Sequence, residues 1–220
     1  MPSFGNLRLN IKLLEKDTII ITKMFEGMAD ALNKGLRLAL PSIEETMQEL
    51  AYFWVGNQPE LEALRSGTLS GHFGLKAGEG QNEVANIVDA IVGSIKIKLT
   101  PVKVKGKSSL SGGLTIYIQQ SDFSNIYAAV APVLTAQGAS LNWIEWLLER
   151  GNDIIVEGFH IEWGNFGRSG QARMKVEGAW RVPPEYSGIA DDNFITRAFE
   201  GKEAQIGRLI EERLGAKMRM

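Results

Sequence analysis

The stretch from residue 95 to residue 107, IKIKLTPVKVKGK, constrains the fold of this chain more than any other. Apolar and charged residues alternate along it, as they do in a strand that buries one face. The alternation shifts by one position at Pro101, so the apolar residues are odd-numbered before it and even-numbered after it. A strand absorbs such a shift only through a bulge or a bend, and Pro101, which cannot donate a ladder hydrogen bond, is the natural place for it.

A second strand pattern, GLTIYIQQ, follows at 113–120 after the Gly- and Ser-rich segment KSSLSGG (107–113). The two strand patterns predict a long projecting β-hairpin over 95–119. Five lysines follow its first strand and turn: Lys96, Lys98, Lys103, Lys105 and Lys107.

Helical patterns stand at both ends of the chain. Apolar residues recur at three- and four-residue steps from Thr18, which predicts a helical region over 18–57. This region is either an αα-hairpin or one long kinked helix, because Pro41 ends or bends it and Ser42 with Glu45 resembles a capping box. Asp191-Asp192 is expected to cap a C-terminal helix over 191–214. Residues 1–17 form an N-terminal segment with a strand pattern at 7–14.

The remaining chain alternates loops with short elements. Residues 64–81 are Gly-rich and predict a loop with one short helical turn, and residues 82–92 have helical spacing. Over 140–182 we expect a helix from the N-cap Ser140 to Gly151 and a strand pair, 153–163 with 172–182, that points Met174, Val176 and Trp180 inward. The prediction is one α+β domain, 1–220, with N- and C-terminal helices packed on an antiparallel sheet.

Composition excludes several kinds of site. The chain has no Cys and only two His, which removes disulfides, Cys-ligated zinc, iron–sulfur clusters and thiol catalysis. His72 lies in a loop without catalytic partners, and His160 beside Glu162 reads as an ordinary exposed strand pair. The segment GNFGRSG (164–170) precedes a strand, whereas a dinucleotide fingerprint opens a helix. We therefore expect no enzyme activity, cofactor or metal.

The sequence shows neither a targeting pattern nor a large net charge. The N-terminus lacks a signal-peptide pattern, and the longest apolar runs, such as Ile19–Ile21, are too short to cross a membrane. A formal net charge of -2 argues against a bulk nucleic-acid binder. The five hairpin lysines are a local exception. They face DNA phosphates or an acidic neighbouring subunit, or else they only guard a strand edge against aggregation.

Two blocks of sequence carry a family resemblance. LRSGTLSGHFGL (64–75) resembles the Thr-Gly-x-Leu-x-x-Ser-Ile segment of head–tail joining and tail-completion proteins of tailed bacteriophages, although Gly67 and Thr68 stand in reversed order and Gly71-His72 replaces Ser-Ile. WIEWLLERGN (143–152), GRSGQARM (167–174) and residues 180–214 are similar to the second half of such proteins. The positions carried over are Gly67, Leu69, Trp143, Trp146, Arg168, Trp180, Pro183, Asn193, Phe194 and Ile195.

The resemblance implies a non-enzymatic virion protein, made in the host cytoplasm. It would form a homo-oligomeric ring, expected to be six-fold, at the head–tail junction. Its partners would be the portal or connector, tail-tube or terminator proteins and, transiently, genomic DNA, with no membrane. A tail-terminator ring or another minor tail protein is the nearest alternative. A cytosolic binding or adaptor domain is the alternative from another class.

Overall fold

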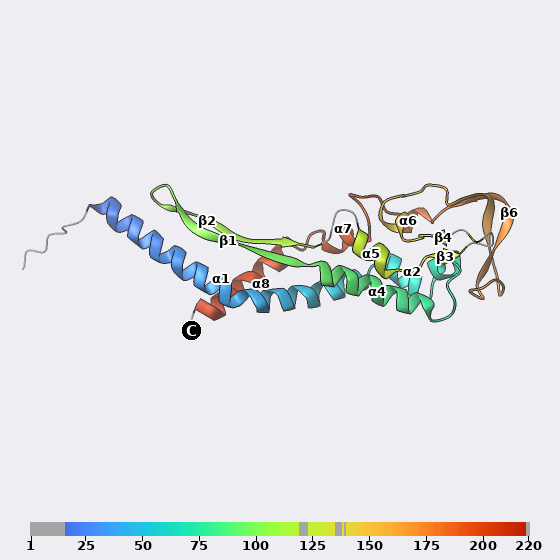
Figure 1. The fold of residues 1–220 in the computed structure, drawn as a ribbon, viewed down its shortest axis with the longest axis horizontal. Helices are drawn as coiled ribbons and strands as arrows, with labels where there is room; N and C mark the ends of the chain where they lie inside the picture. The colour runs from blue at the N-terminus through green and yellow to red at the C-terminus, as the bar shows by residue number, and fades with distance from the viewer. Residues whose placement is uncertain (1–15, 119–122, 135–137, 139, 219–220) are drawn as a thin grey trace, which may run out of the picture.

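One long helix, α1 (Asp17–Gly56), is the axis of the molecule in the computed structural model, which describes residues 16–118, 123–134, 138 and 140–218 (Figure 1). Of the two sequence alternatives, the single long helix is confirmed. The predicted capping box is wrong: the helix runs through Pro41, and the Ser42 carbonyl accepts a hydrogen bond from the Thr46 hydroxyl at 2.9 Å. Pro41 is exposed, and so is Arg37, whose carbonyl loses its helical partner at the proline. The predicted strand at 7–14 lies outside the described residues.

The hairpin of β1 (Lys96–Lys105) and β2 (Ser109–Tyr117) lies along α1. Val102 is buried against Ala29 and Leu36 of α1, and Leu99 and Leu114 pack against the same cluster. Nearer the middle of α1, Ile97 and Ile116 pack against a second cluster, formed by Ala39, Ile43, Met47 and Leu209. The predicted α+β class, with helices at both ends and a long antiparallel hairpin, is confirmed.

The predicted bulge is also confirmed. Thr100 pairs with Gly113 and Lys103 pairs with Ser111, so Pro101 and Val102 together oppose Gly112 alone. A Cβ on Gly112 would lie 2.6 Å from the Pro101 carbonyl oxygen, and its φ of +139° disfavours other residues. The bulge removes Val102 from the ladder. The Asn33 side chain of α1 takes the place of a strand there: its Nδ2 donates to the Val102 carbonyl at 2.9 Å, and its Oδ1 accepts from the Val102 N–H at 2.7 Å.

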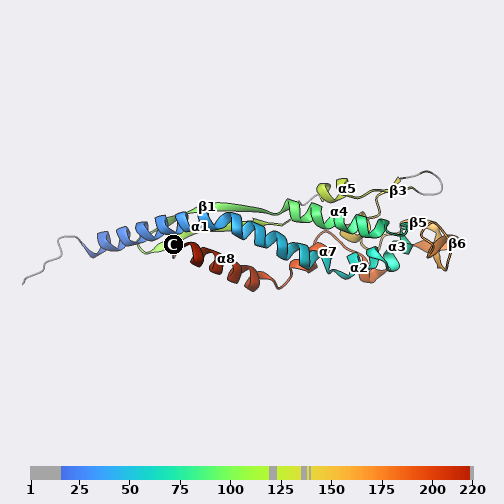
Figure 2. The same cartoon turned by 90° about the horizontal axis from the view of Figure 1, so that it is seen from below.

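The C-terminal helix is two helices. α7 (Phe194–Phe199) and α8 (Glu203–Met218) are separated at Gly201, whose φ is +70°. The predicted cap at Asp191-Asp192 is wrong, because Asn193 caps α7 in a reciprocal capping box with Thr196. Figure 2 shows α8 and the hairpin on different sides of α1.

The other elements gather around the C-terminal end of α1 in a part that we call the head, residues 51–95 and 123–202. Its helices are α2 (Pro59–Arg65), α3 (Thr68–His72), α4 (Glu79–Ser94), α5 (Ser124–Ala129), α6 (Glu145–Leu148), η1 (Pro184–Tyr186) and α7. Its strand pairs are β3 (Val133–Leu134) with β4 (Ser140–Leu141), and β5 (Val156–Trp163) with β6 (Ala172–Trp180). One apolar core joins them to Ala51, Trp54 and Val55 of α1.

Several head predictions need correction. Residues 64–81 contain the end of α2, all of α3 and the start of α4, so more of this segment is helical than expected. The helix predicted over 140–151 shrinks to α6, and Ser140 belongs to a strand rather than an N-cap. Gly151 does adopt the expected left-handed conformation, with a φ of +57°.

Two of the three side chains predicted to point inward from β6 do not. Met174 and Val176 are exposed, whereas Trp180 is buried. The pairing of β5 with β6 shifts between Glu157 and Phe159, and Glu177 and Gly178 both have positive φ, so the simple alternation ends there.

We predict that Asn33→Ala destabilises the protein, because it leaves the Val102 N–H and carbonyl without partners at a partly buried site. The expected loss in the free energy of unfolding is about 1–3 kcal/mol, measured by urea unfolding. Asn33→Asp, which keeps the acceptor and loses the donor, should fall between wild type and Asn33→Ala. The control is Asn86→Ala on the exposed face of α4, expected to change stability by less than about 0.5 kcal/mol. Equal stabilities for Asn33→Ala and this control would contradict the role assigned to Asn33.

Candidate functional site

The five hairpin lysines share the exposed side of β1 and its turn. Lys96, Lys98, Lys103, Lys105 and Lys107 are all exposed. The bulge keeps them on one side, because it turns the strand by one residue where the sequence pattern shifts. Within the described residues, none of the five forms an ion pair.

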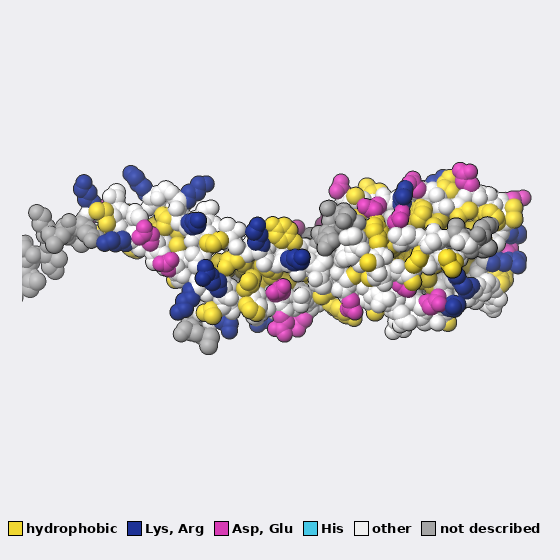
Figure 3. All heavy atoms as spheres, viewed as in Figure 1, with side chains coloured by type: hydrophobic (Ala, Val, Ile, Leu, Met, Phe, Trp, Pro, Cys, Tyr) yellow, Lys and Arg dark blue, Asp and Glu magenta, His cyan; other side chains and the backbone are white. Residues whose placement is uncertain are grey.

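Further basic residues surround them. We call residue 16, residues 17–40 of α1, 98–114 of the hairpin and 213–218 of α8 the stem. Its Lys and Arg residues are Lys16, Lys23, Lys34, Arg37, Lys98, Lys103, Lys105, Lys107, Arg213 and Lys217, and its acidic residues are Asp17, Glu26 and Asp30. Figure 3 shows dark blue side chains gathered over this end of the molecule.

The head has the opposite balance. Its described residues include fifteen Asp and Glu and nine Lys and Arg. The near-zero net charge of the whole chain therefore hides a charge separation along an elongated molecule. Such a separation orients an approaching charged partner and attracts polyanions to the stem alone.

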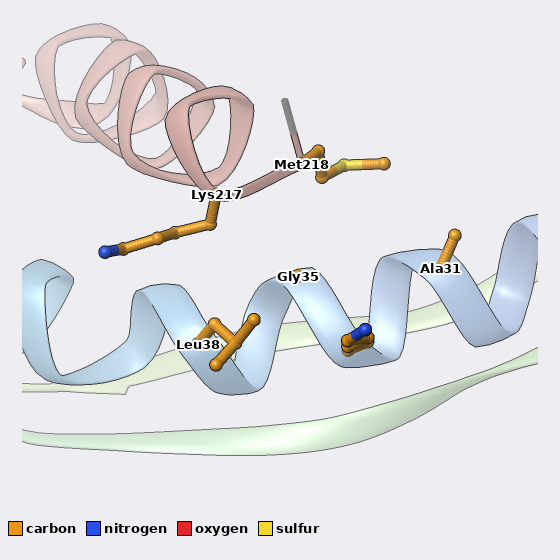
Figure 4. Close-up of a pocket in the computed structure, with 6 residues that line it drawn as sticks. Ala31, Gly35, Leu38, Lys217 and Met218 are labelled. Carbon is orange, nitrogen blue, oxygen red and sulfur yellow. The ribbon is translucent and has the colours of Figure 1, made fainter. Parts of the chain in front are cut away.

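A groove opens in the stem between α1 and the end of α8 (Figure 4). It has a volume of about 500 Å³. Ala31, Gly35 and Leu38 of α1 face Lys217 and Met218 of α8 across it, and Lys34 also lines it. The two helices approach closely at Gly35, where an added Cβ would lie 2.9 Å from Met218 Cγ and 3.0 Å from Leu214 Cδ1.

Apolar side chains continue along α1 beyond the end of α8. Ile21, Met24 and Met28 are 41%, 62% and 50% exposed. The sequence places them on one helix face with Leu32 and Leu36, but the structure packs only Leu32 and Leu36 against the hairpin. α1 therefore has two apolar sides, and α8 covers only part of the second.

The positions carried over from the phage family belong mainly to the head core. Leu69, Trp143, Trp180, Phe194 and Ile195 all join one buried cluster. Gly67 precedes α3, where a Cβ would press on Ala63, and Pro183 precedes η1. Trp146 is half-buried and donates to the Asp153 carbonyl at 3.1 Å, and Arg168 donates to the Gly74 carbonyl at 2.7 Å. Most of these residues therefore contribute to the packing of the head.

Asn193 and Arg197 tie the start of α7 to the rest of the head. The fully buried Asn193 side chain caps α7 and donates to the Ile189 and Ala190 carbonyls. Arg197 contacts Asp192 and the buried Glu60, each at 2.6 Å. The hydrogen bond to Asp192 raises the pKa of Arg197 further.

The two histidines hold structural positions. His72 is buried beside Phe73, Trp163 and Trp180, and its Nε2 lies 2.5 Å from the Arg181 carbonyl. A carbonyl only accepts, so Nε2 carries the proton. Burial lowers the pKa of His72, since desolvation disfavours the imidazolium. His160 contacts the Glu177 carbonyl rather than Glu162. Glu162 forms ion pairs with Arg173 and Lys175, and the hydrogen bond from Arg173 is the main cause of the lowered pKa of Glu162.

Among the described residues, no group of three His, Asp or Glu side chains converges as a metal site requires. None of the described helices combines the length and hydropathy that crossing a membrane takes.

Sequence reasoning missed the groove and its residues. Gly35, Lys34 and Lys217 carry no local pattern, because they meet only when α8 returns to α1. The sequence predicts an apolar face of α1 that includes the exposed methionines. It does not indicate which apolar residues of that face pack against the hairpin.

Comparisons of the chain with protein-family models, with curated proteins and with solved structures find no match.

We predict that the stability of the head depends on pH through His72. The lowered pKa of His72 means that the unfolded chain binds a proton first, so the free energy of unfolding falls as pH drops below about 6.5. His72→Gln retains a donor for the Arg181 carbonyl and cannot titrate. Urea unfolding between about pH 7 and pH 5 should therefore show a flatter pH dependence for His72→Gln than for wild type. Identical slopes would contradict this assignment.

Proposed function

We propose that this chain is a structural, non-enzymatic virion protein of a tailed bacteriophage. It forms a ring at the head–tail junction, through which DNA passes. The sequence resemblance supports the family. The structural observation that carries the proposal is the basic stem, in which a lysine-bearing hairpin is held on α1 at one end of a charge-separated molecule.

The hairpin suits contact with moving DNA. Lysine is a point charge that binds phosphate without fixed geometry, so it attracts the backbone without reading sequence. The ten residues of β1 extend for roughly 30 Å and therefore spread the positive charge along a duplex rather than at one point. Because Asn33 and the apolar cluster hold the hairpin against α1, its lysines are presented by a fixed surface.

The alternative functions differ in position or in assembly. A tail-terminator ring or another minor tail protein would use the same surfaces at another level of the particle, which localisation in assembled particles distinguishes. An adaptor domain would stay monomeric at high concentration, which sedimentation distinguishes.

We predict that the double variant Lys103→Glu, Lys105→Glu still folds and assembles but impairs genome retention or ejection. Both side chains are exposed and form no ion pair with any residue that the structure describes, so the variant replaces attraction to phosphate by repulsion without removing a buried contact. The expected fall in infectious titre is about tenfold or more, with assembly followed by electron microscopy of particles.

The matched control is Lys103→Arg, Lys105→Arg, which keeps the charge at the same positions and should leave the titre unchanged. If the glutamate variant also gave a wild-type titre, the DNA-facing role would be rejected. Protection of the hairpin edge would then be the better account of these lysines.

A further inference from the structure

The groove of the stem is an unfinished helix-packing surface. α8 covers α1 at Gly35, and its last described residue, Met218, lies at the groove. The same side of α1 continues uncovered through Ala31 and Gly27, and a Cβ added at Gly27 would meet no other atom within 4 Å. Met24 and Met28 lie exposed beside these small residues. The α1–α8 contact is thus continuous with an apolar surface that no described part of the same chain covers.

The charges around the groove specify what can bind there. Lys34 and Lys217 line it, both exposed, above an apolar floor of Ala31, Gly35 and Leu38. A fitting occupant presents an apolar side chain flanked by carboxylates. The stem of a second copy does not fit, because two basic stems repel each other.

The head of a second copy carries such a group. Ile189 is 53% exposed, and Asp191 and Asp192 follow it closely. We call residues 188–192 the knob. Met174 and Val176 of the β5–β6 hairpin are exposed as well, but they stand beside Arg173 and Lys175 and would bring like charges to the groove.

The knob is held in a fixed shape. Ile189 and Asp192 exchange two backbone hydrogen bonds, of 2.9 and 3.0 Å. The Asn193 side chain donates to the Ile189 and Ala190 carbonyls. Gly188 lies so close to Leu147 that a Cβ on Gly188 would be 2.0 Å from the Leu147 carbonyl oxygen. A preformed group pays little ordering entropy on binding. Asp192 is engaged by Arg197, whereas Asp191 forms no ion pair within the described residues and is available to a lysine.

We propose that the knob of one copy docks in the stem groove of the next. Ile189 would lie against Ala31 and Leu38, and Asp191 would pair with Lys34 or Lys217. The contact joins two different surfaces, so it propagates from copy to copy and closes into a ring or continues as a filament. Closure into a ring rests on the proposed function.

Disulfide trapping tests this contact directly, because the chain has no Cys of its own. Two variants, Ala31→Cys in the groove and Ala190→Cys in the knob, are purified separately, mixed and oxidised. Both positions are exposed, so neither change disturbs the fold. A disulfide needs Cβ atoms within about 4.5 Å, and we expect cross-linked dimers in the mixture at least about tenfold above either variant alone.

The matched control replaces the knob variant by Ala128→Cys, at an exposed position on α5. Equal cross-linking in this control, or with Ala31→Cys alone, would overturn the proposal. The second of these results would indicate a symmetric contact between stems. Absence of cross-linking in every mixture, at concentrations where sedimentation detects oligomers, would overturn it as well.

A charge exchange gives a second test. Lys34→Glu with Lys217→Glu should weaken self-association about tenfold in sedimentation, and adding Asp191→Lys to the same chain should restore it. Loss without restoration would overturn the pairing. If trapping and restoration succeed but the protein is absent from phage particles, the contact stands and the proposed function fails. If particles contain a ring of this protein without the trapped contact, the proposed function stands and this inference fails.

Discussion

The pairing of Asn33 with the backbone of Val102 is the interaction on which the stem depends. The bulge keeps the lysines outward and the apolar residues inward on both sides of Pro101. It also withdraws one donor and one acceptor from the ladder. One amide side chain on α1 satisfies both groups. The same two bonds fix the hairpin along α1, so the strand register and the helix–hairpin packing are set at one point.

The sequence allowed the bulge to be predicted but not its partner. A period-two pattern is local, and a shift within ten residues is visible without knowing the fold. Asn33 stands 69 positions earlier in an unremarkable helical stretch, and nothing near it indicates an interior partner. The predicted capping box at Ser42 and Glu45 is wrong for the opposite reason: a local pattern is present, but tertiary packing overrides it. Local propensity favoured a helix start there, while Ala39, Ile43 and Met47, fully buried against Leu209, stabilise a helix that runs through.

The candidate site divides in the same way. The five lysines were identified by their alternation, and the structure places all of them on the exposed side of the hairpin. The family positions were identified by resemblance and lie mainly in the head core, where Trp143 and Phe194 are fully buried. The groove could not be predicted, because it exists only where the last helix meets the first across most of the chain length. The separation of charge between head and stem could not be predicted either, since the net charge of the whole chain is nearly zero.

The length of α1 has a consequence for any assembly of this protein. Its 40 residues rise about 1.5 Å each and make a rod of about 60 Å, and its residues join all three apolar clusters. One continuous helix, without a hinge, therefore sets the distance between head and stem. One additional turn would lengthen the helix by about 5.4 Å and leave its faces nearly in phase. Because the hairpin packs against all three clusters along α1, such a change in length would have to occur in α1 and in the hairpin together.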